Sequence, residues 1–234
     1  MQRLTFTFDN GPVPGATDKV LDFLASRSIK ATFFVIGERL RTPAGRRLAE
    51  RAHAQGHWIG NHTLTHGEPL GLVGTANHIE REIGETQRLI GSLAHPQKLF
   101  RPNGKGSLGP HLLSRATADY LMMQAFTLVT WNNVPRDWVD PKTDWLARAV
   151  AALADSPWSL LVLHDQHIAG MMESLAEFHG YLVAKGVEIR QELPPCCLPI
   201  RNGKICEAID GLMALETPAA SSAGQRGRAA TVAS

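Results

Sequence analysis

The chain has 234 residues, of which 44% are hydrophobic and 20% are charged. These fractions are close to those of globular proteins, so they exclude a disordered or fibrous chain, and the length allows one large domain or two small ones. The formal net charge of +2 gives no reason to expect a nucleic acid or a membrane surface as a partner. The sequence leaves the oligomeric state open.

The cysteines and the apolar runs place further limits on the class of protein. Cys196, Cys197 and Cys206 stand late in the chain in no disulfide pattern, so we expect three reduced thiols. The longest apolar runs, such as residues 160–163, are far too short to cross a bilayer. No signal peptide is visible at the N-terminus, which predicts a cytoplasmic protein, or an exported one if the start has been trimmed.

Short apolar runs rich in β-forming residues alternate with amphipathic, helix-like stretches along the chain. The helical patterns are centred on Val20 to Leu24, Leu48 to Ala52, Ile79 to Leu93, Leu146 to Leu153 and Leu175 to Leu182. The strand candidates are residues 4–8, 31–35, 58–61, 99–101, 125–131, 160–163 and 187–189.

This alternation is typical of parallel strands joined by crossover helices, which gives the α/β class. Seven strand candidates fit a barrel a little short of eight repeats or an open doubly wound sheet. We expect one catalytic domain over residues 1–216. Residues 217–234, rich in Ala, Ser, Gly and Thr, are expected to form a flexible tail.

Polar clusters follow most of the predicted strands, where both folds place their functional loops. They occupy residues 9–12, 61–66, 101–104, 131–138 and 164–165. This placement favours a site built from several strand ends.

His62 and His66 are candidate metal ligands. Two histidines four residues apart can project from the same side of a turn, and imidazole nitrogen suits zinc, cobalt, nickel or iron. The alternative is a pair of loop histidines bonded to water or backbone. The carboxyl group of Asp9 after the first strand favours the metal site, because a carboxylate beside a metal-activated water can act as a general base.

The remaining candidates supply charge and a proton donor. Arg101 could hold Asp9 ionised, although most arginines make only surface salt bridges. His164 ends an apolar strand and is a candidate general acid, with a packing histidine as the alternative. Asp137 could orient His164 and raise its pKa, and Trp138 could form an apolar wall.

These clusters together resemble the polysaccharide deacetylases of carbohydrate esterase family 4. The resemblance covers roughly residues 4–190 and lies in the order and spacing of the motifs. The matching segments are TFDNGP at 7–12 (family TFDDGP), ATFFV at 31–35, NHTLTH at 61–66 (H-S/T-x-x-H), FRPNG at 100–104 (RxPxG), RDW at 136–138 (the end of DxxDW) and LVLHD at 161–165 (LxLHD).

The resemblance implies a distorted (β/α) barrel, here with about seven parallel strands, and metal-dependent hydrolysis of acyl groups on sugars. It implies a divalent metal, zinc first with cobalt or nickel as alternatives, and an acetylated sugar as substrate. It implies that Asp9 is the base, with Arg101 as its partner, and that His164 is the acid, with Asp137 as its partner. The implied metal ligands are His62, His66 and Asn10. Trp138 and Leu163 would surround the acetyl group, and the backbone N–H of Asn103 would stabilise the oxyanion.

Three positions depart from the family pattern. Asn10 stands where the family has the third metal ligand, an aspartate, so an uncharged amide oxygen is expected to bind the metal more weakly. Val134 replaces the first aspartate of DxxDW, and Asn103 replaces the aromatic residue often found in RxPxG. We therefore expect a different substrate wall.

The retained base, acid and histidines favour a metal-dependent hydrolase that removes acetyl or other N-acyl groups from an amino sugar or oligosaccharide. One alternative is a non-catalytic carbohydrate-binding relative whose metal site is weakened by Asn10. Another is an α/β protein that binds a different small molecule, which would be supported if His62, His66 and Asn10 failed to converge.

Overall fold

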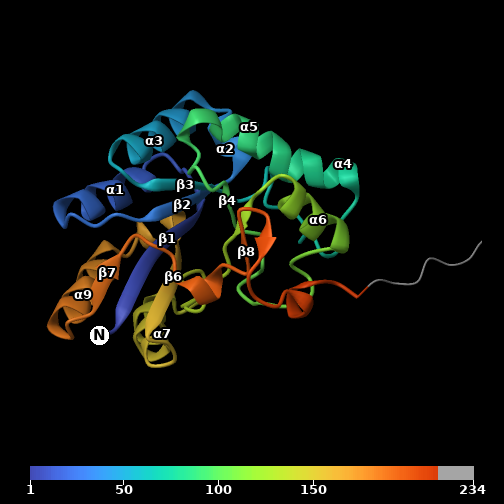
Figure 1. The fold of residues 1–234 in the computed structure, drawn as a ribbon. Coiled ribbons are helices and arrows are strands. Elements are labelled where there is room, and N and C mark those ends of the chain that lie inside the picture. The colour runs from blue at the N-terminus through green and yellow to red at the C-terminus, as the bar shows by residue number, and fades with distance from the viewer. Residues whose placement is uncertain (216–234) are drawn as a thin grey trace, which may run out of the picture.

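A computed structural model describes residues 1–215 and shows a curled parallel sheet covered by helices (Figure 1). The strands run in the order β6-β1-β2-β3-β4-β5, and β7 pairs with the first part of β1. All of these pairs are parallel, which confirms the predicted strands. Their bounds are β1 (Arg3–Gly11), β2 (Thr32–Val35), β3 (Trp58–Asn61), β4 (Leu99–Phe100), β5 (Thr127–Leu128), β6 (Trp158–His164) and β7 (Glu188–Arg190).

The sheet curls until the segment after β5 meets β6. Asn133 forms a single parallel bridge with Leu161, its N–H donating to Leu160 O at 3.2 Å while its own carbonyl accepts from Val162 N at 3.0 Å. The fold is therefore the predicted distorted barrel rather than an open doubly wound sheet.

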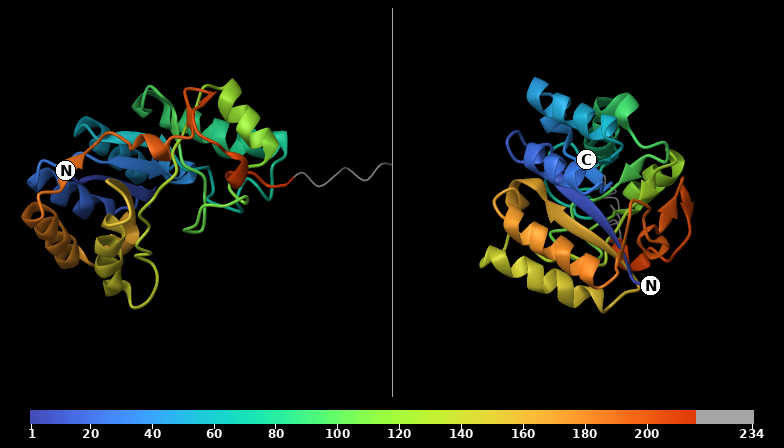
Figure 2. Two further views of the ribbon diagram at one scale, coloured as in Figure 1. Left: turned by 60° about the horizontal axis from the view of Figure 1, so that its bottom comes forward. Right: turned by 90° about the vertical axis from the view of Figure 1, so that its left-hand side faces the viewer.

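Helices cover the outside of this sheet, with α1 and α3 on one side and α7 and α9 on another (Figure 1; Figure 2, right). The five predicted helical patterns all fall on helices. The helices are α1 (Thr17–Ser26), α2 (Gly37–Leu40), α3 (Pro43–Ala54), α4 (Ala76–Ile79), α5 (Thr86–Ile90), α6 (Arg115–Met123), α7 (Trp145–Leu153), α8 (Asp165–Ile168) and α9 (Met172–Ala184).

Helix α6 was not expected from the sequence. The Ser114 side chain caps it by accepting a hydrogen bond from Thr117 N at 3.1 Å, and Ala118 and Leu121 bury its inner face. The stretch between α4 and α5, predicted as one ordinary helix, contains a π-helical turn, Glu80–Glu85. Such a turn is rare and has no simple sequence pattern.

Alternation along the strands separates an apolar outer face from a more polar interior. Phe6 and Phe8 of β1 face the helices, and Phe6 meets the ring of Phe178 on α9 edge-on at 6.2 Å. The side chains between them, Thr7 and Asp9, point into the barrel, since successive side chains of a strand face opposite sides. The hydrophobic outer face packs against the helices, and the polar side chains of the inner face can form a functional site.

Residues 191–215 add to the sheet. The strands β8 (Ile200–Arg201) and β9 (Lys204–Ile205) form an antiparallel hairpin, and β8 pairs antiparallel with β5. Gly203 lies in the turn of this hairpin and adopts a φ of 77°, which favours glycine. A Cβ atom at this position would lie 2.3 Å from Met122 O, near the end of α6.

Three sequence expectations concern the whole chain. Cys196, Cys197 and Cys206 are free thiols, as predicted. Among residues 1–215, no helix has the length and apolar character needed to span a bilayer. The predicted flexible tail, residues 217–234, lies outside the described part.

Candidate active site

A cavity of about 720 Å³ opens at the carboxyl ends of the strands. Arg101 and Asp137 lie fully buried beside it, and Leu163 does not reach it. The other predicted site residues all line it: Asp9, Asn10, His62, His66, Asn103, Trp138 and His164. His62, His66 and Asn10 therefore converge, and this removes the main support for the alternative of an α/β protein that binds a different small molecule.

The topology brings Asp9 and His164 together. β1 and β6 are neighbours, and their register sets Asp9 directly opposite His164. The buried guanidinium of Arg101, at the end of β4, reaches across the barrel and donates from Nη1 to Asp9 Oδ1 at 2.8 Å and to Thr7 Oγ1 at 2.7 Å. Its planar group also lies 4.0 Å from the ring centre of Phe34.

The charge of Arg101 determines the state of Asp9. Burial by itself would raise the pKa of this carboxyl group. The positive charge of Arg101 is the largest opposing effect, followed by the nearby His62 and His164 rings and the Arg101 hydrogen bond, and together they lower the pKa below its usual value. Asp9 is therefore ionised near neutral pH, as a general base must be.

His62 and His66 stand together on the loop after β3, with ring centres 4.9 Å apart. The Nδ1 atom of His62 lies 2.8 Å from the carbonyl oxygen of Arg101, so this nitrogen carries the hydrogen and leaves the lone pair on Nε2. That Nε2 lies 3.7 Å from Asp9 Oδ2. Burial lowers the pKa of both rings, that of His66 to about 3, which keeps them neutral as metal ligands require.

Asn10 supplies an unusual third group. Its backbone adopts the left-handed conformation at φ 70°, and within the described residues its buried Oδ1 atom has no hydrogen-bond partner. No three His, Cys, Asp or Glu side chains of residues 1–215 form a metal-binding group, so the donor set would be His62, His66 and the Asn10 amide. Two neutral imidazoles and an unpaired amide oxygen fit a divalent metal.

His164 is held in place by Asp137, as predicted. Asp137 Oδ1 lies 2.7 Å from Nδ1 of the ring, and its Oδ2 accepts from the His164 backbone N–H at 2.8 Å. Burial works to lower the pKa of His164, but the hydrogen bond and negative charge of Asp137 outweigh it and raise the pKa. The ring can therefore carry a proton at neutral pH and present it through Nε2.

An apolar wall faces the ring of His164. Trp138 meets the His164 ring edge-on, with centres 4.9 Å apart and planes at 86°. Trp131, Val134 and Val162 complete the wall. Val134, at the position of the missing family aspartate, therefore makes this side of the cavity more apolar.

The placement of Leu163 in the pocket was wrong. Leu163 is fully buried in the outer core, and Val162 lines the cavity instead. The cause is strand alternation: His164 faces inward, so the inward neighbour on the same strand lies two residues away. That rule, applied to the sequence, would have found Val162.

The Asn103 side chain ties two loops at the rim of the cavity. Its Nδ2 donates to Gly67 O at 2.6 Å, and its Oδ1 accepts from Lys105 N at 3.3 Å. The side chain thus fixes the loop that carries the Asn103 backbone. At the same rim, Lys105 Nζ lies 3.3 Å from Glu68 Oε2, a pair that the sequence analysis did not single out.

Comparison with known proteins agrees with this geometry. Residues 2–117 match the polysaccharide deacetylase family profile. A chitooligosaccharide deacetylase of Rhizobium leguminosarum bv. trifolii is 35% identical over 164 residues, which cover 70% of this chain and 72% of that protein. A peptidoglycan-N-acetylglucosamine deacetylase of Bacillus cereus is 31% identical over 188 residues, which cover 76% of this chain and 83% of that protein.

A solved structure shares the fold. The crystal structure of the polysaccharide deacetylase Bc1974 from Bacillus cereus superposes with a TM-score of 0.67 at 27% identity, covering 87% of this chain and all of that one. The sequence motifs, the distorted barrel and these relatives agree. The chain belongs to the polysaccharide deacetylase family and is a hydrolase of carbon–nitrogen bonds other than peptide bonds.

Proposed function

We propose that this protein is a metal-dependent deacetylase that removes acetyl groups from N-acetylated amino-sugar residues of an oligosaccharide. The observation that carries the proposal is the pairing of Asp9 with His164 in one cavity, each with a buried partner that adjusts its pKa in the direction its role requires. The relatives that act on chitooligosaccharide and on peptidoglycan N-acetylglucosamine support the substrate class.

His62, His66 and Asn10 would hold the metal. A divalent metal bound there supplies a Lewis acid that polarises the amide carbonyl and makes a water molecule easier to deprotonate. The two neutral rings and the unpaired Oδ1 of Asn10 support this assignment. The amide brings no charge, so weaker metal binding than with an aspartate is expected.

Asp9 takes the proton from the attacking water. Its Oδ1 is occupied by Arg101, which leaves Oδ2, on the side of His62, to accept the proton. Arg101 keeps Asp9 ionised before the reaction and in position during it. The ion pair is buried, so solvent does not screen it.

His164 gives a proton to the leaving amine nitrogen. The Asp137 carboxyl group holds the ring by Nδ1, and the proton leaves from Nε2. The acid thus acts on the amine while the base acts on the water, which are the two proton transfers that amide hydrolysis needs.

The remaining walls position the acetyl group. Trp138 and Val162 form the apolar contact for its methyl group, and the backbone N–H of Asn103 is assigned to the developing oxyanion. The tether from the Asn103 side chain to Gly67 supports this role, because a donor that is fixed beforehand stabilises charge without reorganisation.

Acetate release from N-acetylglucosamine oligomers tests the proposal. Asp9→Asn should lower kcat by about 10²-fold or more, because the general base is lost. Asp22→Asn, which changes an exposed carboxyl group paired with Arg51, serves as the matched control and should leave kcat unchanged. Equal turnover by the Asp9 variant and the native protein would refute the role of Asp9.

A further inference from the structure

The loop that carries both histidines has a demanding backbone conformation. Thr63 and His66 both adopt the left-handed region, at φ 66° and φ 54°, which is uncommon for residues other than glycine. Such a conformation is unfavourable for these residues and persists only where the surrounding structure holds it. The two rings therefore depend on other parts of the chain for their position.

Part of this support comes from α2 and from within the loop. Gly37 N and Glu38 N, at the start of α2, donate to the carbonyl oxygens of Thr63 and Leu64 at 3.0 Å each. The Thr63 hydroxyl accepts from His66 N at 3.1 Å. The carbonyl groups of the loop are thus fixed from one side, and its central N–H groups need a separate acceptor.

Glu82 is that acceptor. Its side chain, from a residue only 3% exposed, accepts from Leu64 N at 3.1 Å and from Thr65 N at 3.0 Å, both at Oε2. The Thr65 hydroxyl lies 3.1 Å from each of the two carboxyl oxygens. One buried carboxyl group therefore accepts the hydrogen bonds of the backbone N–H groups in the middle of the loop.

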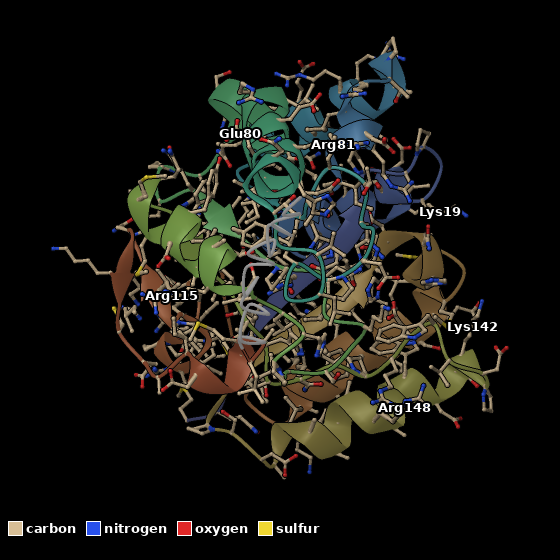
Figure 3. All side chains as sticks on the ribbon, turned by 90° about the vertical axis from the view of Figure 1, so that its right-hand side faces the viewer. Lys19, Glu80, Arg81, Arg115, Lys142 and Arg148 are labelled. Carbon is tan, nitrogen blue, oxygen red and sulfur yellow. The ribbon has the colours of Figure 1, made fainter. Side chains whose placement is uncertain are left out.

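The π-helical turn Glu80–Glu85 connects Glu82 to the strand before the loop. Asn61, the last residue of β3, donates from Nδ2 to Ile83 O at 2.9 Å, and the same side chain accepts from Thr63 N at 3.0 Å. π-Helical turns occur often at functional sites. Glu80, labelled in Figure 3, belongs to the same turn but pairs with Arg88 and Tyr120 away from the loop.

We propose that Glu82 is a positioning residue that holds His62 and His66 in the geometry needed to bind a metal. The Glu82 side chain forms no hydrogen bond with either ring and would act through the backbone N–H groups of Leu64 and Thr65. This inference rests on the proposed metal-dependent function. Glu82 lies in a helical turn and belongs to none of the motifs that follow the strands.

Direct metal binding tests the inference without any substrate. The metal-free full chain is titrated with Co²⁺, whose visible absorption reports the ligand geometry, and then with competing Zn²⁺. Glu82→Leu should weaken binding by about tenfold or more, as loss of supporting groups around metal ligands does. Glu82→Gln should rescue most of the affinity, since its amide oxygen can accept the same two backbone N–H groups.

Controls separate positioning from general damage. Glu80→Gln, on the same turn, should bind Co²⁺ as the native chain does. Thermal unfolding of each metal-free variant reports folding. If Glu82→Leu does not fold, Thr65→Val takes its place. This variant removes one hydroxyl contact to Glu82 and should weaken binding by about threefold.

The outcomes are distinct. A folded Glu82→Leu variant with native Co²⁺ affinity and spectrum would overturn the positioning role and leave the proposed function standing. A native affinity for Thr65→Val would do the same where the leucine variant fails to fold. Absence of metal binding by the native chain would overturn the proposed function and this inference together.

Discussion

Asp137 shows how a single buried residue sets the chemistry of its neighbour. Both of its carboxyl oxygens are used on His164, one on the ring and one on the backbone N–H. This arrangement fixes the ring and favours its protonated form over the neutral one. Arg101 does the opposite for Asp9, where a positive charge favours the ionised form.

Asp137→Asn should therefore change the pH dependence of acetate release. The native pKa of His164 is raised by Asp137, so the acid keeps its proton until the pH rises through that raised value. Without the charge this pKa falls, and the alkaline limb of kcat/KM moves to lower pH, with kcat reduced by about 10²-fold. A pH profile with an unmoved alkaline limb would contradict the assignment of His164 as the acid.

The two faces of β6 are used in different ways. Val162 and His164 face the cavity, whereas Leu161 and Leu163 pack against the helices. A shift of one position along a strand therefore exchanges a side chain that lines the cavity for one that packs in the core.

A pair of substitutions separates these faces. Leu163→Ala should lower the free energy of unfolding by about 2–5 kcal/mol, because it leaves a cavity in the core, and should leave the KM of the folded protein unchanged. Val162→Ala should raise KM by about tenfold through loss of apolar contact with the substrate. Urea denaturation and initial rates provide the two measurements, and the reverse assignment of effects would place Leu163 in the pocket after all.

The parts of the site that follow from local patterns were predictable. The alternation of strands and helices identified the α/β class, and the resemblance to the family identified the barrel. The polar groups after the strands identified Asp9, His62, His66 and His164. Contacts that depend on three-dimensional packing were not predictable. Helix α6 and the β8–β9 hairpin have weak local signals, and the π-helical turn that presents Glu82 has none in the apolar periodicity of residues 79–93.

One sheet connects the site to the hydrophobic core of the molecule. β1 packs against helices on its outer face and carries Thr7 and Asp9 on its inner face. Titratable groups elsewhere on the sheet then affect stability without touching the cavity. His57, before β3, is such a group: it is 2% exposed, and its Nδ1 accepts from Ala31 N at 3.1 Å.

His57 should make the protein less stable in mild acid. Burial, together with the nearby charge of Lys30, lowers its pKa to about 4 in the folded state, while the unfolded chain titrates near 6.5. Between these values the unfolded state binds more protons, so the free energy of unfolding decreases as the pH falls through this range, by on the order of 2 kcal/mol.

His57→Asn keeps an acceptor for Ala31 N but does not titrate in this range. Chemical denaturation of both proteins at pH 7 and pH 4.5 gives the comparison. The native protein should lose more stability than the variant over this interval. An equal loss would show that His57 does not contribute to the acid sensitivity.

Metal dependence is tested by acetate release from the metal-stripped protein during titration with zinc, with Asn10→Asp measured in parallel. We expect no turnover without metal and restored turnover when zinc is added to the native protein. In Asn10→Asp, turnover should return at a lower zinc concentration, because the charged ligand binds more tightly. Turnover by the stripped native protein that zinc does not change would contradict metal dependence. Turnover only in Asn10→Asp would show that the amide of Asn10 does not suffice and that the native chain is a binding protein.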